Sequence, residues 1–409
     1  MGRALADAYP AARDTFTEAD SALGEPLSRL CWEGPEEGLT LTENTQPAIL
    51  TASIAAYRVL EAEGLAGRAR FMAGHSLGEY SAHVAAGTLS FADALAIVRR
   101  RGRYMQEAVP VGTGAMSAIL GLDAEVVSRA CAEASQGDVV SPANLNGAGQ
   151  VVIAGSKSAV ERAGVRAKEL GAKRVIPLSV SAPFHCALMK PAEDRLAPEL
   201  RALATHAPRV PVVANVDAEP KADGTSSIEA LVRQVSSAVR WEDVVRRLAS
   251  EGVTAYVELG PGNVLSGLIR KIHREASVAN IGAPDDLGAA RALLSACRSG
   301  RNARICHPRA AGRLAADLRQ RMVADGASSR KFGSNGRSEA VSGAWHLRCH
   351  SACGRDEGIA DDCGDQQRRR CSDLRDCRLW HCRRPLRDRS CHDCRTRPFV
   401  MAGSGLGYL

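Results

Sequence analysis

The 409-residue sequence predicts an α/β fold in which a large domain with a mainly parallel sheet is interrupted by a small ferredoxin-like domain. Three observations lead to this prediction. Short apolar segments alternate with helical ones, a compact βαββαβ pattern lies in residues 112–178, and a glycine-rich turn near residue 76 joins an apolar segment to a helix.

The large domain is expected to begin with residues 1–111, which are rich in alanine. Apolar residues recur every three or four positions in residues 47–60 and 91–105, so both segments are predicted to be helices. Residues 70–73 are expected to form a short buried strand, and residues 79–86 the helix that follows it.

The small domain is expected to follow Gly112-Thr113-Gly114, which ends the helical pattern. The expected order of strand, helix, strand, strand, helix and strand is that of a ferredoxin-like domain. The segments are 115–122, 124–134, 139–144, 150–154, 158–170 and 173–178. Residues 179–297 should then return to the large domain, with strands at 210–215 and 255–259.

Residues 1–297 have the composition of a soluble protein from a reducing compartment. They hold 30 of the 53 basic and 34 of the 46 acidic residues, a net charge of −4, and four of the 13 cysteines. Few, scattered cysteines do not suggest a disulfide framework, and no apolar run approaches the ~18–20 residues of a membrane span. The start of the sequence has no signal-peptide pattern. We therefore expect a cytoplasmic protein with neither a membrane nor a nucleic acid partner.

Residues 298–409 differ, with 22 Arg, one Lys, 12 acidic residues, nine cysteines and no apolar period. We interpret this tail as disordered, or as a frame-shifted or read-through extension of a GC-rich gene. The alternative is a zinc-binding or nucleic-acid-binding appendage, because Cys391 and Cys394 form a C-x-x-C and arginine suits phosphate contacts. Cys371, Cys377 and Cys382 offer no second pair at zinc-site spacing, so no metal site is predicted.

The pentapeptide Gly74-His75-Ser76-Leu77-Gly78 carries the clearest functional signal. A G-x-S-x-G run between a strand and a helix is the nucleophile elbow of α/β-hydrolase-like domains, where a sharp turn exposes the serine oxygen. The glycines permit close backbone approach, and the helix N-terminus offers N–H groups to developing negative charge. Ser76 is therefore predicted to be a nucleophile.

A nucleophilic serine needs a base, and His185 in Pro183-Phe184-His185-Cys186 is the best candidate. The residues alone leave open a purely structural, interior histidine at this position. His75 is expected to be structural, because neighbouring side chains on a sharp turn point apart.

Several motifs together resemble the malonyl-CoA:acyl carrier protein transacylases of fatty-acid synthesis over roughly residues 1–282. They occur in the family's order: TQPA at 45–48, GHSLGEYSA at 74–82, MQEAVPVGTGAM at 105–116, NLN at 144–146, GQVVIAG at 149–155, PFHCALM at 183–189 and ELGPG at 258–262.

This resemblance implies transfer of the malonyl group from malonyl-CoA to the phosphopantetheine thiol of acyl carrier protein through a malonyl-serine, without a cofactor. It implies that Ser76 is the nucleophile, that His185 is the general base and that the Leu77 N–H is an oxyanion-hole donor. A backbone carbonyl in the region of Gln234 would orient His185 in place of a triad acid.

The resemblance also implies how the acyl group is selected. Arg101 matches the arginine that binds the free malonyl carboxylate, and a planar guanidinium can hold a carboxylate through two parallel hydrogen bonds. For the other arginines of residues 99–103 we prefer a solvated helix face. Phe184 should crowd an α-methyl branch, so malonyl is expected over methylmalonyl.

Two observations keep alternatives open. The elbow alone would suit a serine thioesterase or hydrolase. In addition, family members normally begin with a buried strand and a Gly-Gln-Gly-Ser-Gln loop whose glutamine N–H is the second oxyanion donor, and this sequence contains neither. We therefore expect a gap in the centre of the sheet, and loss of such a donor costs ~10²–10³ in turnover. A truncated, inactive acyltransferase homologue is thus a further alternative.

Overall fold

The computed structural model describes residues 1–299 and 399–403, which belong to one compact unit. Cys391 and Cys394, on which the alternative of a zinc-binding or nucleic-acid-binding tail rests, lie outside the described residues. The helices are α1 (Arg3–Ala8), α2 (Pro10–Leu23), α3 (Leu27–Glu33), α4 (Glu36–Thr40), α5 (Thr42–Ala62), α6 (Leu77–Ala86), α7 (Phe91–Glu107), α8 (Ala124–Ser135), α9 (Lys157–Glu169), α10 (Lys190–Arg201), α11 (Gly224–Gln234), α12 (Trp241–Ser250), α13 (Val264–Ile272) and α14 (Asp286–Ser299), with 3-10 turns η1 (Ala66–Arg68) and η2 (Ala187–Met189).

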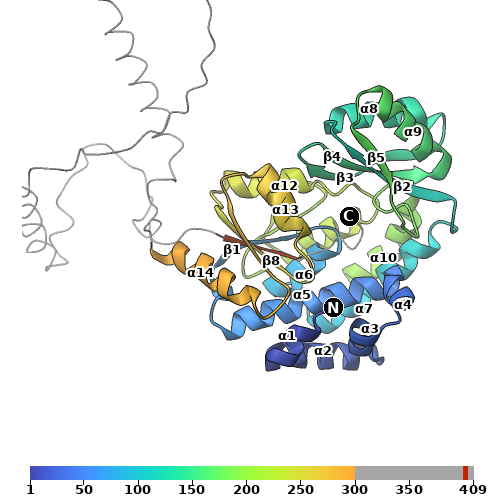
Figure 1. Ribbon diagram of the computed structural model, residues 1–409. Helices are drawn as coiled ribbons and strands as arrows, with labels where there is room; N and C mark the ends of the chain where they lie inside the picture. Colours follow the sequence, from blue (N-terminus) through green and yellow to red (C-terminus); the bar gives the residue numbers. More distant parts are fainter. Residues whose placement is uncertain (300–398, 404–409) are drawn as a thin grey trace, which may run out of the picture. The chain divides into compact units, whose positions relative to one another are not determined.

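The strands form two sheets, and this confirms the predicted α/β class (Figure 1). They are β1 (Ala69–Gly74), β2 (Gly114–Leu120), β3 (Val140–Gly147), β4 (Gln150–Ser156), β5 (Arg174–Pro177), β6 (Val212–Val213), β7 (Pro220–Lys221), β8 (Ala255–Leu259), β9 (Ser277–Ile281) and β10 (Phe399–Gly403). The large sheet has the order β7-β6-β1-β10-β8-β9 and is parallel except for β7.

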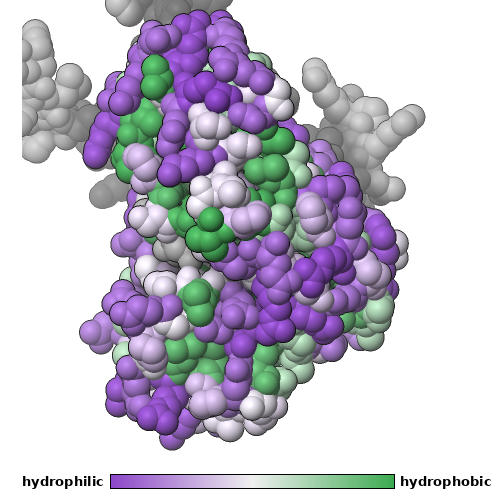
Figure 2. Space-filling model, turned by 90° about the vertical axis from the view of Figure 1, so that its right-hand side faces the viewer, coloured by the Kyte–Doolittle hydropathy of each residue, from purple (hydrophilic) through white to green (hydrophobic). Residues whose placement is uncertain are grey.

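Both faces of the large sheet are covered, as a parallel sheet requires. Because side chains alternate along a strand, neighbouring residues pack into different clusters. Met72 and Val257 pack with residues of α5 and α6, whereas Ala73 and Tyr256 pack with residues of α12 and α13. No described helix could cross a membrane, and the face in Figure 2 is mostly hydrophilic with small hydrophobic groups.

The small sheet is antiparallel, with the order β3-β4-β2-β5, and its connections confirm the predicted βαββαβ run. Helices α8 and α9 cover one face (Figure 1). The other face packs Met116, Ala143 and Val152 against Phe184 and Cys186. The segment that contains His185 is thus fixed between the small sheet and the large domain.

Helix α5 begins five residues before its predicted start at Pro47. Pro47 lies in its second turn, where proline lacks the N–H that would bond four residues back. In the rest of α5 every residue except Arg58, Glu61 and Ala62 is buried, so tertiary packing outweighs this local loss.

Strand β10 corrects two expectations about the tail and the sheet. Phe399–Gly403 pairs in parallel with β1 on one side and with β8 on the other, so the expected gap in the centre of the sheet is occupied. The tail is therefore not disordered over these five residues. Val400 is fully buried among residues that include Trp241 and Tyr256.

The position of β10 predicts a strong effect of Val400→Asp. A carboxylate at this fully buried position would lack a partner, so we expect the free energy of unfolding in urea to fall by more than ~3 kcal/mol. Val165→Asp on α9, where the side chain is 59% exposed, is the control and should change it by less than ~1 kcal/mol. Equal, small effects would mean that β10 does not lie in the sheet.

Candidate active site

The turn between β1 and α6 holds Ser76 in a strained conformation. Its φ is 53° and its ψ is −109°, values that non-glycine residues rarely adopt and that cluster at functional sites. A Cβ on Gly74 would lie 1.9 Å from the carbonyl oxygen of Gly78, so only glycine fits where the strand end meets the helix. The Leu77 N–H is the first of α6 and has no acceptor within the helix.

Ser76 and His185 form a direct pair although 109 positions separate them. The distance from Ser76 Oγ to His185 Nε2 is 2.6 Å, and His185 Nδ1 lies 2.9 Å from the main-chain oxygen of Gln234. Because a carbonyl only accepts, Nδ1 carries the ring proton and Nε2 is free to accept from Ser76. The structure thus brings together three of the residues predicted from the sequence.

His185 is neutral in this setting. Burial, followed by the positive charge of Arg101, lowers the pKa of His185 to about 3. Its φ of 60° is in the left-handed region, a second strained residue at the same site. The arrangement can therefore accept a proton from Ser76 at neutral pH without a carboxylate partner on the imidazole.

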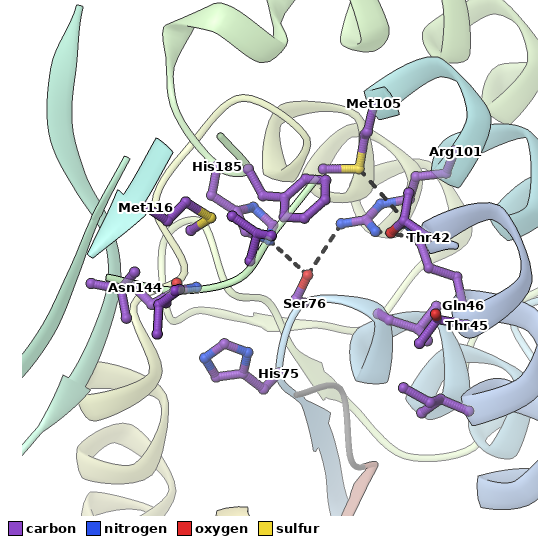
Figure 3. Close-up of a pocket in the computed structure, with 16 residues that line it drawn as sticks. Thr42, Thr45, Gln46, His75, Ser76, Arg101, Met105, Met116, Asn144 and His185 are labelled. Carbon is purple, nitrogen blue, oxygen red and sulfur yellow. Dashed lines mark hydrogen bonds between the residues drawn. The ribbon is translucent and has the colours of Figure 1, made fainter. Parts of the chain in front are cut away.

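Arg101 and His185 both reach Ser76 Oγ, each from its own side (Figure 3). It is 2% exposed, and its Nη2 donates to Ser76 Oγ at 3.2 Å and to Gln234 Oε1 at 3.0 Å. Its Nη1 donates to Gln46 Oε1 at 2.7 Å. Within the described part of the chain these partners are all uncharged, so Arg101 is a buried cation without a salt bridge.

The close packing of α7 on α5 places this guanidinium. A Cβ on Gly102 would lie 2.6 Å from both Glu43 Cα and Thr42 O, so the glycine lets the two helices meet beside Arg101. Arg99, Arg100 and Arg103, in contrast, form salt bridges with glutamates.

Ser76, His185 and Arg101 line one pocket (Figure 3). Both domains line it, and Phe184 and Leu77 belong to its wall. Other described wall residues are Thr42, Thr45, Gln46, Ile49, His75, Met105, Met116, Asn144, Val152, Leu178 and Val180. None of these residues is acidic, so the wall suits an apolar ligand with one negative end.

His75 points away from the reacting groups (Figure 3), in line with the structural role expected for it. Its Nε2 lies 3.0 Å from Asn146 Oδ1, and its ring packs against Trp241 at a centroid distance of 5.7 Å. Burial lowers its pKa to about 4, so the ring is neutral. His75 thus links the elbow to strand β3 of the small domain.

The sequence predicts no role for three residues at the site. Gln46 holds Arg101, Asn215 binds the Ser76 N–H through Oδ1 at 2.7 Å, and Glu79 accepts from both Asn215 and Gln234. The spacing from Ser76 to Glu79, S-x-x-E, was one available signal. Among the residues described, no three His, Cys, Asp or Glu side chains gather as a metal site would require.

Comparison with known proteins identifies the family of this chain. Residues 1–299 match the family described as acyl transferase domain. The chain belongs to this family. It is 52% identical to the malonyl CoA-acyl carrier protein transacylase of Escherichia coli K12, over 71% of this chain and 93% of the relative. It is 48% identical to the Bacillus subtilis 168 protein of the same name, over 70% and 90%.

Solved structures agree with this membership. An acyl carrier protein S-malonyltransferase from Vibrio cholerae superposes with a TM-score of 0.69 at 49% identity, covering 71% of this acyl transferase and 94% of that chain. A malonyl-transacylase in complex with a type II PKS acyl-carrier protein superposes with a TM-score of 0.69 at 49% identity. The match covers 72% of this chain and 94% of that chain.

The buried histidines predict acid sensitivity. Burial lowers the pKa of His83, on α6, to about 3, whereas an unfolded histidine titrates near ~6.5. The unfolded state therefore binds more protons below ~6.5, and stability is lost as pH falls from there. Between pH 7 and pH 5, the free energy of unfolding measured in urea should fall in the unaltered chain. In His83→Leu this fall should be smaller by ~2 kcal/mol. The same pH dependence in His83→Leu and in the unaltered chain would contradict the neutral state of His83. The raised pKa of Glu79 opposes the loss of stability at low pH, but it does so equally in the variant and in the unaltered chain.

Proposed function

We propose that this acyl transferase moves the malonyl group from malonyl-CoA to the phosphopantetheine thiol of acyl carrier protein. The observation that carries this proposal is the buried Arg101 guanidinium, which touches Ser76 Oγ and has no carboxylate partner in the described chain. A desolvated cation beside a nucleophile selects an acyl group with its own carboxylate. The names of the relatives point to the same substrates.

In the first half-reaction, Ser76 Oγ attacks the thioester carbonyl while His185 Nε2 takes its proton. The Leu77 N–H stabilises the oxyanion, and the Gln234 carbonyl keeps the proton of His185 on Nδ1. The C–S bond then breaks, the CoA thiolate receives the proton from His185, and malonyl-Ser76 remains. Arg101 holds the malonyl carboxylate throughout.

In the second half-reaction, the thiol of acyl carrier protein gives its proton to His185 and attacks the malonyl-Ser76 ester. The collapse returns the proton to Ser76 Oγ and releases malonyl-acyl carrier protein. Because Arg101 fixes the malonyl group, the ester faces the incoming thiol in a defined orientation, which favours transfer. We place this reaction in fatty-acid synthesis in the cytoplasm.

Incubation with malonyl-CoA should leave one malonyl group on Ser76. Intact mass and peptide mapping would measure this label, and acyl carrier protein should discharge it faster than water does. Ser76→Ala should carry no label. A thioesterase would instead release malonate at the same rate with and without acyl carrier protein.

Arg101→Ala should lower kcat/KM for malonyl-CoA by ~10²-fold or more, because a charge-assisted, bidentate contact is lost. Transfer of the uncharged acetyl group should be retained or improved. Steady-state rates with the two thioesters test this, with Arg103→Ala on the exposed helix face as a control. An equal loss for both substrates would remove Arg101 from carboxylate binding.

Phe184 lines the pocket beside His185 and should exclude an α-methyl branch. Phe184→Ser should therefore raise the ratio of methylmalonyl-CoA to malonyl-CoA turnover by ~10-fold, the usual scale for one methyl group. Comparable turnover of the two thioesters by the unaltered chain would contradict this role.

A further inference from the structure

Glu79 lies at the position of a capping-box glutamate but makes different contacts. With Ser76 at the N-cap of α6, Glu79 occupies the third helical position, from which a glutamate normally reaches back to the N-cap N–H. Here Asn215 takes that place, because its Oδ1 accepts from the Ser76 N–H while its own N–H donates to Glu79 Oε2 at 3.0 Å. The Ser76 side chain makes no capping bond and is free to meet His185.

The second contact of Glu79 is with Gln234, which in turn contacts Arg101. Its Oε2 accepts from Gln234 Nε2 at 2.7 Å, and the same Nε2 donates to the Ser76 carbonyl at 2.9 Å. The other end of this amide, Oε1, accepts from Arg101 at 3.0 Å. An amide between a carboxylate and a guanidinium has one favourable orientation, with its NH₂ toward the anion and its oxygen toward the cation.

We propose that Glu79 is a positioning residue for acyl selection, acting through the Gln234 amide on the guanidinium of Arg101. This inference rests on the proposed function. The carboxylate of Glu79 fixes the orientation of the Gln234 side chain, and Gln234 Oε1 then holds Arg101 against Ser76. Because the amide separates the two charges, Arg101 keeps its carboxylate-binding edge for the substrate.

The surroundings of Glu79 determine how it responds to pH. Burial raises its pKa to about 7, assisted by Asp217 after β6 and opposed by hydrogen bonds from Gln234 and Asn215 and by the Arg101 charge on α7. Tyr80, also near, has a pKa raised to about 12, and that of Asp217 is lowered, so neither titrates near neutrality. Glu79 is charged above pH ~7 and loses its charge below it.

The experiment compares kcat/KM for malonyl-CoA and acetyl-CoA in the full chain between pH 6 and 8. Glu79→Gln replaces the charged acceptor of Gln234 Nε2 by a neutral one and so weakens the hold on this amide. The malonyl-to-acetyl ratio at pH 8 should therefore fall about tenfold, the scale of one charge-assisted hydrogen bond. In the unaltered chain the ratio should fall as pH decreases through 7, and in Glu79→Gln it should be flat. The malonyl carboxylate titrates near ~4 and His185 lower, outside this range.

Glu258→Gln is the matched control, because Glu258 is equally buried and accepts from the first turn of α13 without contact to the site. It should lower stability and leave the ratio unchanged. The proposal would be overturned if the malonyl-to-acetyl ratio of Glu79→Gln at pH 8 equalled that of the unaltered chain. It would also be overturned if the ratio of the unaltered chain did not depend on pH, and this measurement can be made even if Glu79→Gln does not fold. Failure of malonyl-CoA to label Ser76 in the unaltered chain would refute the proposed function itself and is a separate result.

Discussion

The buried guanidinium of Arg101 is the constraint on which the site depends. A cation removed from water is costly unless polar groups surround it, and here Gln46, Gln234 and Ser76 supply uncharged oxygens. The same charge helps to keep His185 unprotonated. The Arg101 cation thus favours the neutral form of the base and contacts the nucleophile. It has no anionic partner among the described residues, so it can bind the carboxylate of a substrate.

Backbone strain places the reacting atoms around this charge. Ser76 and His185 both have positive φ angles, and each is held by structure on either side. Ser76 lies between β1 and α6, whereas His185 lies on a segment packed under the small sheet. The inserted domain is therefore part of the site, because its sheet fixes the loop that delivers the imidazole to the large domain.

The elbow and the ferredoxin-like order could be predicted because local patterns encode them. Ser76 follows from five residues between a strand and a helix. His185 was the best candidate base from the residues, with a structural histidine left open, and the roles of His185, Arg101 and Gln234 followed from the resemblance. Gln46, Asn215 and Glu79 were missed because their contacts join segments far apart in the chain. Strand β10 was missed because its five residues show no distinctive pattern, and a central strand depends on the neighbours with which it pairs.

The position of Glu79 explains why His185 Nδ1 donates to the main-chain oxygen of Gln234 and not to a carboxylate. A carboxylate on His185 Nδ1 would favour the protonated ring, which cannot accept a proton from Ser76. Its negative charge could also pair with Arg101, and this would oppose binding of an anionic acyl group. Glu79 instead lies beyond the Gln234 amide, whose main-chain oxygen meets His185 and whose side chain meets Arg101. Gln234 thereby contacts the base His185, the carboxylate-binding Arg101 and the buried acid Glu79. This arrangement places no negative charge in the pocket wall.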